Sequence, residues 1–137
     1  MSDLFSQELE SLLELERRLA DEVLPELRGR AHAIDLREAL DRHMLETEEH
    51  VANLKSVRAL AVGAGALEGE DFAILLDVLR TEALEVAAYR FLVHAANALG
   101  LDEEAVRLLR LNMEQDAYAL EQAEHALAKL LAEKVGD

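Results

Sequence analysis

The amino-acid sequence predicts an all-α protein, folded as an antiparallel four-helix bundle. Leucine, alanine, glutamate and arginine dominate the composition, and all four are strong helix formers. Apolar residues recur at helical spacing in four long segments, and no segment alternates with the period of two that marks a strand. The segments have similar lengths and short joints, as a four-helix bundle requires. We expect one domain, 1–137, long enough to bury its own core.

The first two helices are delimited by proline, glycine and acidic residues. The first is expected from about Asp3 to Leu27, with Pro25 ending or kinking it and Gly29 following as a break. The second is expected to begin at Asp35, whose carboxylate can cap it, with Glu38 three residues later as in a capping box. It then continues to about Val62.

The last two helices follow a glycine-rich connection over residues 63–71. The third is expected over about 71–99. Gly100 then gives a C-terminal stop, and Asp102 caps a fourth helix over about 103–134. Nine or ten extended residues reach about 30–35 Å. Both a crossover along the bundle and plain up-down-up-down topology therefore remain open.

Charge and composition exclude several classes of function. The chain has 29 Asp and Glu against 14 Lys and Arg, and a formal charge of −15 repels nucleic acid and anionic membranes. No apolar stretch approaches the roughly 18 residues of a membrane span. Without cysteine there are neither disulfides nor thiolate metal sites. The acidic start "MSDLFSQELE" does not look like a signal peptide, so we expect a cytoplasmic protein.

Several ionisable residues fall on the faces predicted to be buried. The stretch "DRHMLETEEH", residues 41–50, belongs to the second helix. His43, Thr47 and His50 lie at the centre of the apolar face of this helix, which we call its stripe, and Glu46 lies at the edge of the stripe. Glu16 lies within the stripe of the first helix.

The third and fourth helices add further carboxylates. Glu82 lies within the third stripe, Glu85 lies at its edge, and Asp116 borders the fourth. A buried carboxylate must be protonated, paired or bound to a cation. Inward carboxylates and imidazoles at one level can build a dimetal site, whose donors suit iron, manganese or zinc. The alternative is a hydrogen-bonded polar network, in which Tyr89 bonds a carboxylate, while Glu121 and His125 form a surface pair.

Three segments together resemble the YciE/YciF stress-protein family of the ferritin-like superfamily. They are "DLFSQELESLLELERRLADEVLPEL", "LREALDRHMLETEEHVANL" and "TEALEVAAYRFLVHAANALGLDEEA". The shared features are an acidic first helix closing in Leu-Pro, a His-x3-Thr-x2-His second helix and a Glu-x2-Glu-x3-Tyr third helix. The resemblance implies a ferritin-like bundle, commonly a dimer, with a dinuclear metal site and a link to stress responses.

Five residues match the family positions for metal ligands: Glu16, Glu46, His50, Glu82 and Glu85. The fourth helix departs from the pattern, because it offers "MEQDAY" in place of paired glutamates. Asp116 or Glu114 is then the substitute.

Two functions follow as hypotheses. The first is an oligomeric, ferritin-like bundle that binds iron or manganese and oxidises Fe(II) or handles peroxide in stress defence; whether it is an enzyme is left open. The second is a metal-free oligomeric scaffold with a buried polar network, which would hold no cofactor. Leu45 and Leu60 point away from the second stripe and could mark a dimer contact in either case.

Overall fold

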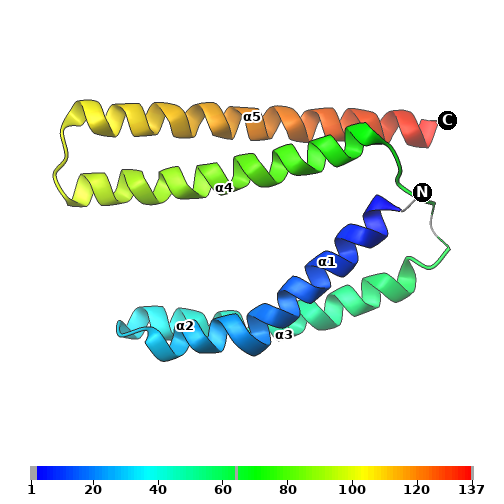
Figure 1. The fold of residues 1–137 in the computed structure, drawn as a ribbon, viewed down its shortest axis with the longest axis horizontal. Helices are drawn as coiled ribbons and strands as arrows, with labels where there is room; N and C mark the ends of the chain where they lie inside the picture. Colours follow the sequence, from blue (N-terminus) through cyan, green and yellow to red (C-terminus); the bar gives the residue numbers. More distant parts are fainter. Residues whose placement is uncertain (1–2, 64, 137) are drawn as a thin grey trace. The chain divides into compact units, whose positions relative to one another are not determined.

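The computed structural model describes residues 3–63 and 65–136, and within these ranges it contains helices and no β-strand (Figure 1). The elements are α1 (Leu4–Arg18), the π-helix η1 (Leu19–Val23), α2 (Leu24–Arg30), α3 (Ile34–Leu60), α4 (Glu70–Ala98) and α5 (Glu103–Gly136). The predicted all-α class is confirmed.

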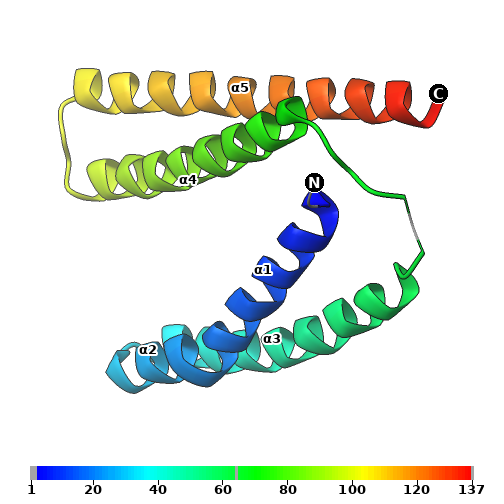
Figure 2. The ribbon, with the colours of Figure 1, turned by 45° about the vertical axis from the view of Figure 1, so that its right-hand side comes forward.

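The helices group into two compact units, Met1–Glu68 (unit 1) and Gly69–Asp137 (unit 2). In unit 1, α1, η1 and α2 follow one another as one long helix that packs along α3. In unit 2, α4 and α5 run antiparallel, side by side (Figure 2). The two hairpins thus supply the four long helices that a four-helix bundle needs.

The first helix does not end at Pro25, so that part of the expectation is wrong; the chain continues through η1 into α2 and changes direction there (Figure 1). Leu24 donates its N–H to the carbonyl of Leu19, five residues back, which makes the wider π turn of η1. Pro25 follows this π turn directly. A proline inside a continuous helix removes one backbone hydrogen bond and crowds the carbonyl four residues back, and the wider π turn accommodates its ring. The helix continues through Gly29 to Arg30.

The predicted capping box of the second helix is also wrong. Helix α3 begins at Ile34, its N-cap is Ala33, and no side chain caps it. Asp35 lies instead in the first turn, where its negative charge still favours the positive end of the helix dipole. The connection between α4 and α5 agrees with prediction: Gly100 adopts a φ of +69°, and Asp102 Oδ1 accepts the N–H of Glu104 at 2.7 Å.

Asp3 closes unit 1 by joining the start of α1 to the segment that follows α3. Its Oδ1 accepts N–H bonds from Phe5 at 3.2 Å and Leu67 at 2.9 Å, and its Oδ2 accepts the hydroxyl of Ser6. The N–H of Leu4 donates to the Leu67 carbonyl at 2.9 Å. The Ser6 and Leu67 bonds, with smaller help from other backbone N–H groups, lower the pKa of Asp3 from its usual value.

The buried side chains are few and mostly aliphatic. Unit 1 buries Leu13, Leu24, Ala31 and Thr47; unit 2 buries Val86, Val93, Ala96 and Ala123. In α1 the side chain of Leu13 is 1% exposed, whereas that of the adjacent Leu12 is 38% exposed. Two adjacent leucines belong to the same broad apolar face, and the crossing of α1 over α3 decides which is covered.

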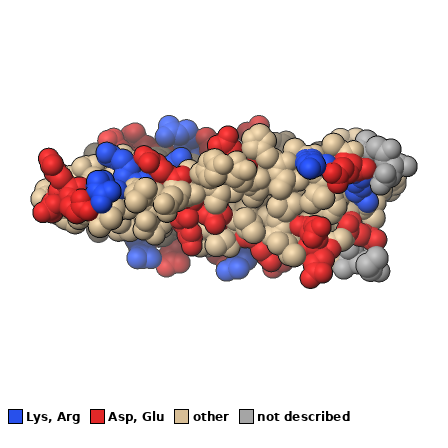
Figure 3. Space-filling view, turned by 90° about the horizontal axis from the view of Figure 1, so that it is seen from above, with Lys and Arg blue, Asp and Glu red and all other residues tan. Residues whose placement is uncertain are grey.

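Charged and uncharged side chains are interspersed on the face shown in Figure 3, which is seen from above the view of Figure 1. Among the described residues, no helix has an apolar stretch long enough to cross a bilayer.

Candidate metal centre

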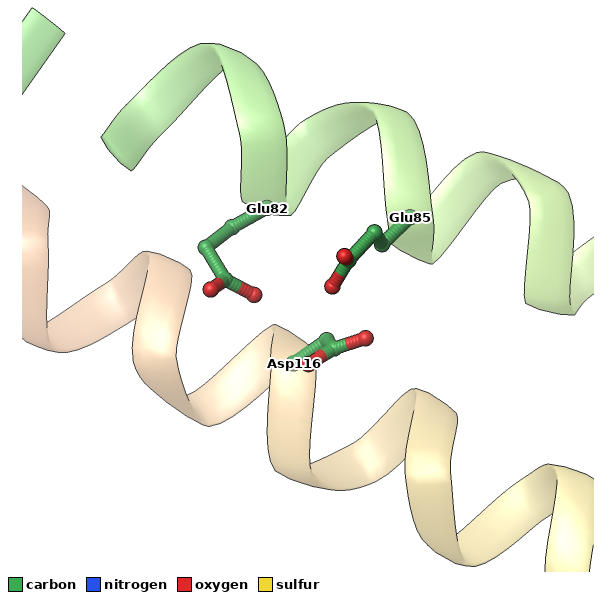
Figure 4. A group of neighbouring side chains, drawn as sticks. All are labelled: Glu82, Glu85 and Asp116. Atoms are coloured by element: carbon green, nitrogen blue, oxygen red, sulfur yellow. The ribbon is translucent and has the colours of Figure 1, made fainter. Parts of the chain in front are cut away.

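Three carboxylates converge between the two helices of unit 2. Glu82 and Glu85 extend from α4, where their spacing of three residues puts them on one face, and Asp116 extends from α5 (Figure 4). One oxygen from each side chain lies within 4.8 Å of the others. Glu82 and Asp116 are half-buried and Glu85 is exposed.

The cluster is electrostatically unfavourable for three ionised groups. Desolvation, with the charge and hydrogen bonding of Asp116, raises the pKa of Glu82. For Glu85 the pKa is raised first by a hydrogen bond to Asp116, then by the Asp116 charge, desolvation and the Glu82 charge. Glu82 Oε2 is also buried without a hydrogen-bond partner. A proton or a cation would relieve both the repulsion and the unpaired oxygen.

The donor set fits a metal ion. Carboxylate oxygens bind hard cations at about 2.0–2.6 Å, so two oxygens that share an ion lie no more than about 5 Å apart. The oxygens of Glu82, Glu85 and Asp116 already meet that condition. These three residues could hold a metal ion.

A second polar layer lies one helical turn from the carboxylates. Asn112 donates its Nδ2–H to the Tyr89 hydroxyl at 3.2 Å. Tyr89 follows Glu85 by four residues and Asn112 precedes Asp116 by four, so antiparallel helices place this pair next to the cluster. Tyr89 thus pairs with an amide rather than with the carboxylate expected from sequence. Asn112 was missed, although its spacing from Asp116 was a usable signal.

In unit 1, Glu16 of α1 meets His50 of α3. Glu16 Oε2 lies 3.5 Å from His50 Nδ1, and the Glu16 side chain is only 16% exposed. The contact does not satisfy hydrogen-bond geometry, and Glu16 Oε2 is a buried oxygen without a hydrogen-bond partner. The pairing of these two predicted site residues therefore leaves an acceptor open.

His43 and Glu46 lie at the surface of the same hairpin, with Nδ1 and Oε2 3.9 Å apart and both side chains about half exposed. Between the two histidines, Thr47 is fully buried, and its hydroxyl donates to the His43 carbonyl at 2.7 Å. The predicted inward direction of Thr47 is confirmed.

The predicted site residues are thus gathered in three places. The largest group is Glu82, Glu85 and Asp116 in unit 2; unit 1 holds the Glu16–His50 and His43–Glu46 contacts. Of the two substitutes considered on the fourth helix, the carboxylate group contains Asp116 and not Glu114. Glu121 and His125 form the expected exposed pair, 3.9 Å apart.

Comparison with known proteins adds one family match. The family described as "Domain of unknown function (DUF892)" matches residues 1–68, slightly less than half of the chain. These are also the residues of unit 1, so the match does not extend to the carboxylate cluster. No curated protein and no solved structure matches the chain.

Proposed function

We propose that the protein is a ferritin-like, homodimeric metal-binding protein of the YciE/YciF type that acts in stress defence in the cytoplasm. The observation that supports this most is the convergence of three carboxylate oxygens within 4.8 Å, with Glu82 Oε2 buried and unpaired. The resemblance of the first three helices to that family and the family match over residues 1–68 support it independently.

Iron or manganese is the proposed metal, because hard carboxylate donors suit both ions. Glu82, Glu85 and Asp116 would hold it, with the half-buried Glu82 limiting the access of water on its side. Glu16, Glu46, His43 and His50 are the further donors proposed, and an imidazole would bind through a neutral ring nitrogen.

Oxidation of Fe(II) is the reaction that such a carboxylate site would favour. Carboxylates stabilise Fe(III) over Fe(II), because the added positive charge is balanced by negative ligands. With hydrogen peroxide as oxidant, two Fe(II) ions give two electrons, two protons are taken up, and two water molecules form. These two protons would come from the surrounding water, to which Glu85 is exposed.

Metal titration of chelator-treated protein tests this proposal. We expect saturable binding of Mn(II), and of Fe(II) without oxygen, by calorimetry. Asp116→Asn should weaken it roughly 10-fold or more, since it removes one charged ligand oxygen. Glu114→Gln is the matched control: it removes a neighbouring exposed charge outside the carboxylate group and should leave binding unchanged.

Two results would contradict the proposal: equal affinities of wild type and Asp116→Asn, or no transition metal bound and no Fe(II)-dependent consumption of hydrogen peroxide.

A second candidate function is a metal-free scaffold that acts by oligomerising or by docking a partner. The Asn112–Tyr89 hydrogen bond, one helical turn from the carboxylates of Glu85 and Asp116, favours it, because such polar layers can fix the register of packed helices. In that case chelator should leave the thermal stability of freshly purified protein unchanged.

A further inference from the structure

Helix α4 presents a second apolar face that the hairpin does not use. Val86 and Val93 are buried where α5 packs along α4. Leu84 and Phe91 precede these two residues by two positions each, about 200° around the helix. They are 73% and 71% exposed.

These two side chains belong to a heptad-like row. Exposed or half-buried apolar residues follow one another at intervals of four, three, four and three residues, the spacing at which helices pair. We call this row the outer seam; it consists of Leu84, Ala88, Phe91, Ala95 and Ala98. At about 1.5 Å per residue it is about 21 Å long.

From Ala88 to Ala98 the outer seam also lies within a stretch of this strongly acidic chain that carries no acid; Leu84 lies just before it, next to Glu85. From Val86 to Leu101 there is no Asp or Glu, and Arg90 is the one formally charged residue. Two copies of a chain with a formal charge of −15 repel each other, so they approach most easily through an acid-free surface.

We propose that the outer seam binds the outer seam of a second copy of this chain, antiparallel and about a two-fold axis at Phe91. In this arrangement Leu84 faces the partner's Ala98, so that a large side chain meets a small one, and the two Phe91 rings meet at the axis. A parallel pairing would instead set the acidic first halves of the two α4 helices against each other, with Glu70, Asp71 and Asp77 in each.

The seam fits a second copy better than the two leucines first considered on α3. Leu60 is 85% exposed, but the residues four and seven positions before it are Ser56 and Asn53. Leu45 is followed by Glu46, Glu48 and Glu49. Neither has the row of apolar neighbours that the outer seam offers. The inference rests on the homodimeric state in the proposed function and not on its metal site, so sedimentation tests the seam and metal titration tests the site separately.

Sedimentation over a range of concentrations tests the self-association. A four-turn seam buries less than the roughly 800 Å² per partner of a standard interface, so we expect a dimer that dissociates at micromolar concentration. Phe91→Glu should weaken it by roughly 100-fold or more, because each copy would bury an unpaired charge. Leu60→Glu is the matched control and should leave the dimer intact, with circular dichroism confirming that both variants keep their helix content.

Single cysteines report the geometry directly, because the chain contains no cysteine of its own. Under mild oxidation Phe91→Cys should form a disulfide dimer, since a two-fold axis brings that position beside itself. Leu84→Cys alone should not, whereas Leu84→Cys combined with Ala98→Cys should.

Three results would overturn the proposal: a monomer at every concentration, a dimer that Leu60→Glu dissociates and Phe91→Glu does not, or cross-linking of Leu84→Cys to itself as fast as of Phe91→Cys.

Discussion

Ionisation of Glu82 is disfavoured in the folded protein, because its side chain loses water and faces Asp116. Its folded pKa is raised above the value of 4.5 of a free carboxyl group. The folded state therefore keeps this proton to higher pH than the unfolded state does. The contribution of protonated Glu82 to folding stability is fully present below pH 4.5 and is lost as the pH rises through the raised pKa of Glu82.

We predict that, in the metal-free protein, Glu82→Gln removes the loss of folding stability that the wild type shows as the pH rises. The variant and the wild type should melt at similar temperatures near pH 4.5, and the variant should melt higher at pH 7. Melting curves in chelator measure the difference. Adding Mn(II) at pH 7 should reverse the order, since only the wild type has the complete carboxylate set; a variant less stable at pH 7 in chelator would contradict the repulsion.

Asp3 behaves in the opposite way, because its hydrogen bonds lower its folded pKa below 3.8. Its stabilisation is present above pH 3.8 and is lost as the pH falls through the lowered pKa. We predict that Asp3→Ala lowers the melting temperature at pH 7 and that the difference narrows in acid. Amide hydrogen exchange should show faster exchange at Leu67, whose N–H loses its partner; unchanged protection there would argue against this role.

The sequence could predict which residues belong to the candidate sites, but not how their side chains pair or how exposed they are. Helical periodicity indicated Glu16, Glu82 and Asp116 because it depends only on the angle between residues of one helix. It could not show that His50 stays about half exposed beside Glu16, since that depends on the packing of α1 against α3. Helical periodicity likewise could not identify Asn112 as the hydrogen-bond partner of Tyr89, because the register of α4 on α5 is set by contacts between the two helices.

At the scale of helices, the extents were predictable wherever local chemistry dominates. Gly100 and Asp102 delimit α4 and α5 as expected, because the left-handed turn and the cap form within a few residues. The expected helix end at Pro25 and the expected cap at Asp35 were wrong, because neither is decided by the local sequence alone. A π turn accommodates the proline, and the chain enters α3 from Ala33, which leaves Asp35 inside the helix.

The packing of α1 on α3 is testable with two neighbouring leucines. Leu13 is 1% exposed and Leu12 is 38% exposed, although both belong to the same apolar face. We predict that Leu13→Ala costs about 2–5 kcal/mol, since it removes buried methyl groups and leaves a cavity. Leu12→Ala should cost about half of that or less. Urea unfolding of the two variants gives the comparison, and equal losses would contradict the burial seen in unit 1.

At the scale of the whole molecule, the dominant property is the formal charge of −15. Like charges on one chain destabilise its compact state, and like charges on two copies oppose their association. Salt screens both effects, with a Debye length of about 30 Å at 0.01 M and about 8 Å at 0.15 M. Surface ion pairs such as Arg58–Glu10 weaken in salt, but exposed pairs contribute little.

We therefore predict that monovalent salt raises the melting temperature of the chelator-treated protein and strengthens its dimerisation together. Sedimentation and melting in 0.01 M and about 0.15 M sodium chloride measure the two effects. The proposed interface is apolar and free of acid, so screening acts on the rest of the surface and not on contacts across the seam. The Phe91→Glu variant should gain melting temperature in salt as the wild type does and yet stay monomeric. If salt instead dissociated the wild-type dimer, its contacts would have to be ion pairs, and an apolar seam on α4 could not be the interface.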